Sequence, residues 1–268
     1  MRAKLQDGEM IYPPYTRRST VCKIIAVILL ATGARAFDAT PMMSFFRVDI
    51  TTSTDPVPDY VSRWLLDDNI ATTNVLDDSG RNNGYATANS SIMHGLGKIG
   101  TGSFTNCSID KVWVPDAANL KSNYFSVTAW AWQYVNDPSY PIIAIKPVTY
   151  LGGNEQFGLG GNSGKLSFWV KATTMKYALG AVNSMNELTG GWHFVAGVYD
   201  GTNVMIYLDG IERGRTAASG AITTSTNPLH IGLPFSVFVG LNGKIDDVRY
   251  YGRPISSNEV LTIYNAYK

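Results

Sequence analysis

Apolar and polar residues alternate along much of this chain, and short groups containing glycine separate the apolar runs. The clearest example spans residues 190–210, where two runs rich in aromatic and β-branched residues, 192–199 and 203–208, are each followed by Asp-Gly. Asp-Gly between such runs predicts a β-hairpin, because glycine accepts the positive φ of a tight turn. We therefore predict a meander of at least three antiparallel strands in this region.

The first of these runs carries apolar residues on both of its faces. Trp192, Phe194 and Val198 share one face, and Val195 and Tyr199 share the other. A strand with one face in water would alternate apolar and polar residues instead. The run is therefore predicted to be an inner strand that is covered on both sides.

The same pattern recurs through the rest of the chain. It predicts further strands at 60–67, 100–104, 108–114, 125–134, 142–146, 155–159, 165–170, 176–180, 229–232 and 243–251. Residues 125–134 are predicted to form a long central strand, and residues 116–120 one helical turn.

Only one helix longer than a single turn is predicted, and it lies at the C-terminus. Ser256 and Glu259 have the spacing of a capping box, which predicts a short helix that runs through Tyr264. The spacings between strands are too short for crossover helices. The predicted fold is therefore all-β, an antiparallel two-sheet sandwich with a short C-terminal helix.

The charge of the chain is divided unevenly. The whole chain has 22 basic and 21 acidic residues, and residues 1–36 hold six of the basic and two of the acidic ones. The remaining residues therefore have 16 basic and 19 acidic side chains. A mildly acidic body gives no electrostatic reason to expect nucleic acid as a partner.

The basic excess belongs to a predicted export signal. Three basic residues precede the apolar run 24–31, and Ala34 and Ala36 supply the small residues of a cleavage site, so we predict a signal peptide over residues 1–36. The apolar run is shorter than the roughly 20 residues that cross a bilayer, so no permanent membrane span is expected. Because Asp7 and Glu9 are unusual at the front of a leader, translation from Met10 is an alternative to translation from Met1. The prediction places the protein outside the cytoplasm, secreted or at the cell surface.

Residues 37–58 show no convincing period and are predicted to be a linker or an extended arm. The sandwich is then expected to occupy residues 59–268. Seven short segments within it stand out, and the helix around Glu259 follows them. The segments are 64–67, 78–84, 125–130, 192–196, 207–210, 231–232 and 240–251.

In these segments the chain resembles the laminin-G-like jelly-roll domains of the concanavalin-A-like lectin and glucanase superfamily. The resemblance implies a jelly-roll sandwich, and it implies that the tryptophans of the central strands belong mostly to the core.

The superfamily includes glycosidases, so the resemblance raises the possibility of catalysis. Those enzymes use two carboxyl groups, which the superfamily's glucanases carry in a Glu-x-Asp-x-x-Glu pattern. The pattern is absent here, and the glutamates outside the leader are scattered: Glu155, Glu187, Glu212 and Glu259. The histidines His94, His193 and His230 lie in separate segments without the spacing of metal ligands or a catalytic triad. We therefore predict a protein that is not an enzyme.

Three pairs of aspartates, 67–68, 77–78 and 246–247, raise the question of a metal. Calcium takes six to eight oxygen ligands, which loops rich in Asp and Asn can supply. Since the resemblance implies calcium at a rim of the sandwich, the candidate ligands are Asp78, Asn83, Asp246 and Asp247. The alternative is structural: an Asx turn at Asp78-Ser79-Gly80 and capping of strand ends by Asp246 and Asp247.

Sugar recognition uses exposed aromatic side chains that stack on the sugar ring. The candidates in or near predicted loops are Tyr85, Tyr140, Tyr150 and Phe235, with ordinary packing as the alternative for each. The predicted function is an exported, non-catalytic module that binds glycans or another extracellular surface with the help of calcium. The alternative is a structural or adhesive component of a cell envelope or virus particle that assembles through residues 37–58, and a glycoside hydrolase with an unrecognised site ranks third.

Overall fold

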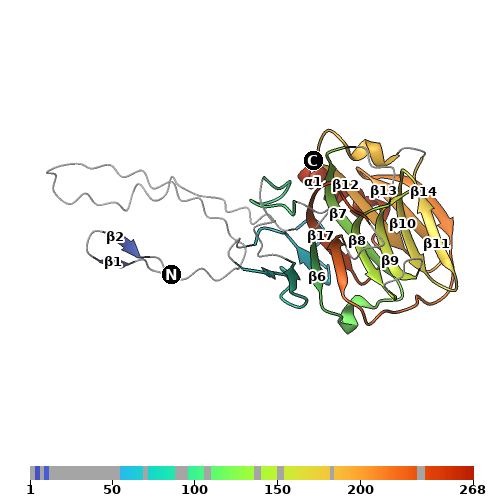
Figure 1. Cartoon of the computed structure of the whole chain (residues 1–268), viewed down its shortest axis with the longest axis horizontal. Helices are drawn as coiled ribbons and strands as arrows, with labels where there is room; N and C mark the ends of the chain where they lie inside the picture. Colours follow the sequence, from blue (N-terminus) through green and yellow to red (C-terminus); the bar gives the residue numbers. More distant parts are fainter. Residues whose placement is uncertain are drawn as a thin grey trace, which may run out of the picture. The chain divides into compact units, whose positions relative to one another are not determined.

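The computed structural model describes residues 55–68, 72–87, 96–105, 110–135, 140–149, 154–181, 184–233 and 239–268, and the backbone of residues 4–6 and 9–11 (Figure 1). The chain forms two units, Met1–Asp55 and Pro56–Lys268. In the first unit, β1 (Lys4–Gln6) and β2 (Glu9–Ile11) pair antiparallel. The remaining elements belong to the second unit.

One layer of the second unit is a six-stranded sheet with the strand order β14-β13-β12-β7-β17-β3. Its strands are β3 (Ser62–Trp64), β7 (Phe125–Gln133), β12 (His193–Tyr199), β13 (Asn203–Leu208), β14 (Ile211–Ala217) and β17 (Gly243–Tyr251). β7 lies between β12 and β17, so the segment predicted as a long central strand is one. The meander predicted at residues 190–210 is confirmed as β12, β13 and β14.

The other layer is a nine-stranded sheet with the order β11-β10-β9-β8-β15-β6-β5-β4, in which β16 pairs with β8 in parallel and the other pairs are antiparallel. Its strands are β4 (Asn74–Val75), β5 (Gly84–Ala86), β6 (Lys111–Val114), β8 (Pro141–Pro147), β9 (Glu155–Asn162), β10 (Lys165–Lys171), β11 (Met175–Leu179), β15 (Leu229–Gly232) and β16 (Val239–Gly240). Neighbours such as β8 and β15 are far apart in sequence, as in a jelly roll.

Two aromatic contacts show that the inner faces of the sheets share one core. Phe125 of β7 lies between the layers, with its ring centroid 5.3 Å from that of Phe157 in β9 and 6.0 Å from that of Phe168 in β10. Gly197 of β12 allows this approach, because a Cβ at that position would stand 2.1 Å from the Phe168 ring. The predicted two-sheet sandwich is therefore confirmed.

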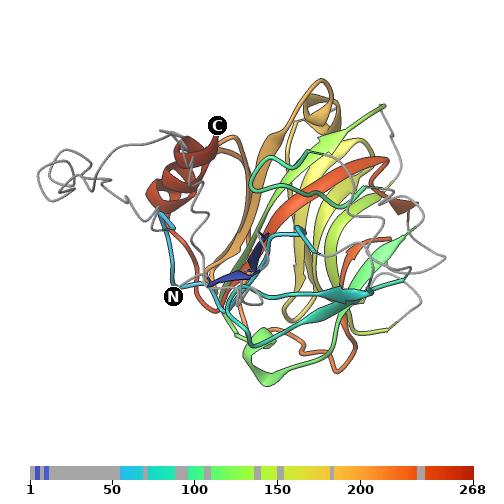
Figure 2. The same cartoon turned by 90° about the vertical axis from the view of Figure 1, so that its left-hand side faces the viewer.

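A single α-helix in the described part of the chain, α1 (Ser257–Tyr267), follows the last strand (Figure 2). The predicted capping box is present: the Glu259 amide donates to Ser256 Oγ, and the Glu259 carboxylate accepts from the Ser256 amide. Val260 and Ile263 pack against the outer face of the six-stranded sheet. None of the helices described is both long and apolar enough to span a membrane. Two short 3-10 helices, η2 (Ala118–Leu120) and η3 (Ser184–Leu188), lie in connections.

The helix explains why β12 is apolar on both faces. Val195 and Tyr199 belong to the core between the sheets, whereas Phe194 and Val198 belong to the cluster beneath α1. The prediction of an inner strand covered on both sides is confirmed.

Two predicted strands were wrong in extent or type. The strand predicted at 60–67 is reduced to β3, because Leu66 has a φ of 59° and turns the chain out of the extended conformation. Residues 100–104 are not a strand. Only Phe104 bridges to Ile245, and the glycines before it form a loop whose amides point at aspartate side chains.

Candidate ligand-binding surfaces

The predicted cation ligands Asp78 and Asp247 do lie around one positive charge, but that charge is a guanidinium group. Arg63 Nε is 2.6 Å from Asp247 Oδ1, and Arg63 Nη1 is 4.0 Å from Asp78 Oδ2. Arg249 pairs with the second oxygen of Asp247 at 2.8 Å. Asp247 and Arg249 are fully buried, so this is an internal ion cluster.

Asp246 points in another direction. It accepts hydrogen bonds from the amides of Lys98 and Ile99 at 2.6 and 2.8 Å. Asp67 holds the same loop by accepting from the amides of Thr101 and Gly102. Burial raises the pKa of Asp246 well above its ordinary range, against the opposing effect of the two amides. These carboxylates position a glycine-rich loop.

Asn83 takes part in a turn. Its Oδ1 accepts from the amide of Asp77 at 2.9 Å. The Asx turn that the sequence placed at Asp78 begins one residue earlier, because the Asp77 carboxylate accepts from the amides of Ser79 and Asn82. Asp78 instead accepts from the Tyr60 hydroxyl at 2.9 Å.

The four residues do not fit calcium as one ligand set. Their oxygens already bind arginine, tyrosine or backbone donors, and the described residues contain no group of three or more acidic, histidine or cysteine side chains suited to a metal. Asp246 and Asp247 do not cap strand ends either. They lie at a register shift inside β17, where Asp247 has a φ of 46°.

Two of the four predicted aromatic candidates lie among the described residues. Tyr85 is exposed on β5, with its ring centroid 4.9 Å from that of Trp113 on β6. Tyr140 is also exposed, and its hydroxyl lies 3.1 Å from that of Ser163. Tyr150 and Phe235 fall outside the described residues. The pair formed by Tyr85 and Trp113 is a small aromatic platform on the nine-stranded sheet.

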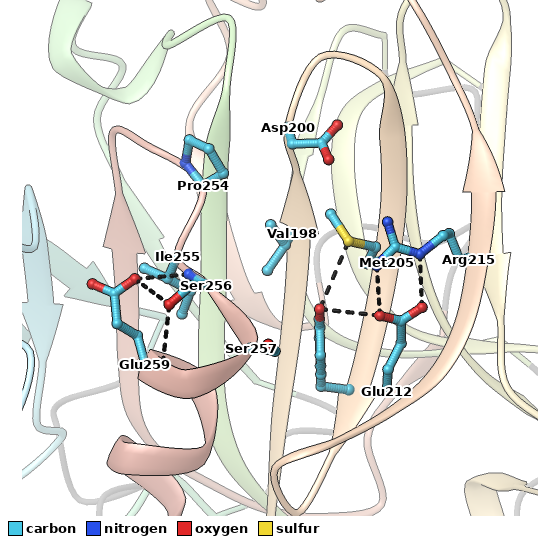
Figure 3. A pocket seen from close by; sticks show the side chains of 11 residues that line it. Val198, Asp200, Met205, Glu212, Arg215, Pro254, Ile255, Ser256, Ser257 and Glu259 are labelled. Atoms are coloured by element: carbon cyan, nitrogen blue, oxygen red, sulfur yellow. Dashed lines mark hydrogen bonds and ion pairs between the residues drawn. The ribbon is translucent and has the colours of Figure 1, made fainter.

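A groove of about 400 Å³ separates strands β12 to β14 from the start of α1 (Figure 3). Val198 and Met205 line it from the sheet, and Ile255 and Ser256 line it from the helix side. It carries three carboxylates, those of Asp200, Glu212 and Glu259. A glycosidase uses two carboxyl groups, one of which must carry a proton as the general acid.

Hydrogen bonding lowers the pKa of all three carboxyl groups. Hydrogen bonds from Arg215 lower the pKa of Glu212, and those from Arg253 lower the pKa of Glu259 to about 2. Burial would raise the pKa of Asp200, but hydrogen bonds from Thr202 and Asn203 outweigh it and lower the pKa. A general acid must hold a proton near neutral pH, which these groups do not.

The histidines in the described part of the chain add no catalytic arrangement. His193 Nδ1 lies 2.7 Å from Asp209 Oδ2, and the other oxygen of Asp209 accepts from the Phe194 amide, so the pair ties β12 to the turn after β13. His230 is buried in β15, and burial lowers its pKa to about 4. His94 lies outside the described residues.

Sequence reasoning missed an aromatic cluster on the outer face of the six-stranded sheet. Trp132 of β7 has its ring centroid 6.1 Å from those of both Trp192 and Tyr134, edge to face in each case. Lys244 of β17 stands opposite Trp132 in the strand register, with its Nζ 5.5 Å from the ring centroid. We call these four residues the tryptophan surface.

The tryptophan surface is accessible, unlike its neighbour on the same strand. Trp130 is buried beneath α1, with its ring stacked 6.1 Å from that of Tyr264. Trp132 and Trp192 are only partly buried, and Tyr134 is 49% exposed. The resemblance assigned such tryptophans to the core. The sequence did contain a pattern that could have predicted this cluster, because Trp130, Trp132 and Tyr134 are spaced two residues apart and so share one face of a strand.

The family model for the concanavalin A-like lectin/glucanases superfamily matches residues 79–261, and the chain belongs to this family. Comparison with curated protein sequences gave no match.

Solved structures that share the fold include three of low sequence identity. Domain 4 of AbnA, an extracellular arabinanase from Geobacillus stearothermophilus in complex with arabinotriose, is 18% identical with a TM-score of 0.59, and the match covers 77% of this chain and 98% of that domain. The ligand binding domain of botulinum neurotoxin serotype D, in complex with N-acetylneuraminic acid, is 16% identical with a TM-score of 0.59, over 80% of this chain and 52% of that one. Trypanosoma rangeli sialidase is 14% identical with a TM-score of 0.56, over 78% of this chain and 33% of that one.

Proposed function

We propose that this chain is an exported, non-catalytic module that binds glycans through the tryptophan surface. The observation that carries the proposal is the gathering of Trp132, Trp192 and Tyr134 at a solvent-accessible place on the sheet. Pyranose rings present apolar C–H faces that pack on aromatic rings, and binding sites are commonly lined by aromatic side chains with a few polar groups.

The rigidity of the surface supports this role. Trp132 and Lys244 belong to paired central strands, and Trp192 packs against the cluster beneath α1. A site built on strands presents its side chains in a fixed arrangement, which reduces the entropy lost on binding.

Two further observations support glycan binding outside the cell and without catalysis. Two of the structures that share the fold were solved with a sugar, and one of them is described as part of an extracellular enzyme. Hydrogen bonds lower the pKa of the carboxyl groups in the groove, which does not suit them to be a general acid. The predicted leader over residues 1–36 accounts for export.

A glycan array probed with the purified full chain tests the function. The preferred glycan is then titrated calorimetrically against the chain and against the variant Trp192→Ala. We expect the variant to bind roughly tenfold more weakly or worse, because a central aromatic anchor contributes more than 1 kcal/mol. Its melting temperature, measured in parallel, establishes that it is folded.

The matched control is Tyr85→Ala, which removes an exposed aromatic from the nine-stranded sheet. It should leave the affinity unchanged. Binding that is lost in Tyr85→Ala and kept in Trp192→Ala would move the site to the platform formed by Tyr85 and Trp113. Failure to bind any glycan on a broad array would overturn the proposed function.

A further inference from the structure

We propose that the glycan bound at the tryptophan surface is acidic, and that Lys244 and Lys98 recognise its carboxylate or sulfate group. This inference rests on the proposed function and names the ligand class of the same site. The evidence for it is the set of positive charges and hydrogen-bond donors around the tryptophan rings.

Two ammonium groups stand over neighbouring rings of one strand. Lys244 Nζ lies 5.5 Å from the centroid of Trp132, and Lys98 Nζ lies 4.8 Å from the centroid of Trp130. The two tryptophans are two residues apart on the same face of β7, a spacing of about 6.6 Å along a strand. Neither lysine forms an ion pair within the part of the chain that the structure describes. Both lysine side chains are only partly buried, so that a ligand can reach them.

The nearby carboxylate does not neutralise them. Asp246 stands opposite Trp130 in the register of β17 and β7. It is fully buried, it accepts from the amides of Lys98 and Ile99, and burial raises its pKa well above the ordinary range. Its oxygens are therefore engaged by backbone amides rather than by either lysine ammonium group.

The carboxylates of the adjoining elements are also occupied. Asp209, in the turn after β13, pairs with His193. Glu187 of η3 pairs with Arg213 at 2.8 Å. The oxygens of these two carboxylates are therefore engaged by groups other than the two lysines.

The polar atoms of the rings match an anion as well. The indole N–H groups of Trp132 and Trp192 donate no hydrogen bond to any residue of the described chain. An indole nitrogen can only donate, and so can an ammonium group. A surface of donors and cations complements the oxygens of a carboxylate or sulfate better than it complements neutral hydroxyl groups.

The groove of Figure 3 has the opposite character and does not suit the same ligand. It is lined by Asp200, Glu212 and Glu259. Arg215 and Arg253 pair with the two glutamates, whereas Asp200 pairs with no cation in the part of the chain that the structure describes. An acidic glycan would be repelled there. The charge distribution therefore favours the tryptophan surface over the groove.

Matched pairs of glycans test the inference with the full chain. One arm compares a carboxylated oligosaccharide with its methyl ester, and the other compares a sulfated oligosaccharide with its desulfated form. We expect the acidic member of at least one pair to bind about tenfold more tightly, with a preference that shrinks between low and high salt because ionic contacts at a surface are screened. The arm that shows the preference identifies the acidic group.

Variants locate the effect. Lys244→Ala should reduce the preference severalfold, Lys244→Arg should retain it, and the double variant Lys244→Ala with Lys98→Ala should remove it. Lys176→Ala, on β11 of the other sheet, is the matched control and should change nothing.

Equal binding of the acidic and neutral members would overturn this inference and leave the proposed function standing. A preference that survives in the double variant would overturn the assignment to Lys244 and Lys98. Absence of binding to every member of both pairs and to the array would overturn the proposed function itself.

Discussion

Arg63 donates a hydrogen bond from Nε to Oδ1 of Asp247 over 2.6 Å, and this contact joins β3, the first strand of the sandwich, to β17, the last. Asp247 is fully buried, and Arg249 holds its second oxygen. The two arginines therefore share this carboxylate, and Asp78 lies 4.0 Å from Arg63 as a second acidic partner.

Asp247→Asn should destabilise the protein by about 3–5 kcal/mol, because it removes the carboxylate that pairs with two guanidinium groups, one of them fully buried. Asparagine tolerates the positive φ of this position, so the change isolates the charge. Urea unfolding measures the loss. The control is Arg213→Ala, which breaks the exposed pair with Glu187 and should cost at most about 1 kcal/mol. Equal effects of the two variants would contradict the importance of the buried cluster.

Removal of calcium should not change the stability. Asp78, Asp246 and Asp247 are already bound by protein donors, so they offer no vacant ligand set. We expect the same melting temperature in excess calcium and in a chelator. A stabilisation by calcium that Asp247→Asn abolishes would show that these carboxylates do hold the ion.

Gly197→Ala should weaken the packing of the two sheets. A Cβ there would stand 2.1 Å from the Phe168 ring, and overpacking of a core typically costs about 1–3 kcal/mol. Gly191→Ala is the matched control, because a Cβ at that position meets nothing within 4 Å, and it should cost less than about 0.5 kcal/mol. Denaturant unfolding of both variants measures the difference, and equal stabilities would contradict the close approach.

The Glu259 carboxylate should make stability depend on pH at the acidic end. Hydrogen bonds from Arg253 lower its pKa from 4.5 to about 2 in the folded protein. A lowered pKa contributes stability that is fully present above pH 4.5 and is lost as the pH falls towards 2. Glu259→Gln keeps the capping geometry and removes the charge. Its melting temperature should fall below that of the unchanged chain at pH 7 and approach it near pH 2, whereas a constant difference across this range would contradict the role of ionisation.

Local structure was the part that the sequence predicted well. The strands 165–170 and 229–232 have close counterparts in β10 and β15, and the turn at Asp209-Gly210 is tight, with positive φ at both residues. These features depend on neighbours in the chain, so period and turn chemistry were sufficient to find them. The short strands β4 and β16 were missed, because two residues carry no period.

The candidate site was less predictable. Tyr85 and Tyr140 are exposed, as a loop aromatic was expected to be. The tryptophan surface was not found, because Trp130 and Trp132 look equivalent in the sequence and differ only in whether α1 reaches them.

The sequence by itself determined an antiparallel sandwich, a capped terminal helix and membership of a lectin-like family, because alternation, glycine turns and the capping box act over a few residues. Only the tertiary structure decided that Asp247 pairs with Arg63, 184 residues away, and that Trp132 is only partly buried. Charge pairing and burial depend on which distant segments pack together, and a periodic pattern along one strand carries no information about its partner.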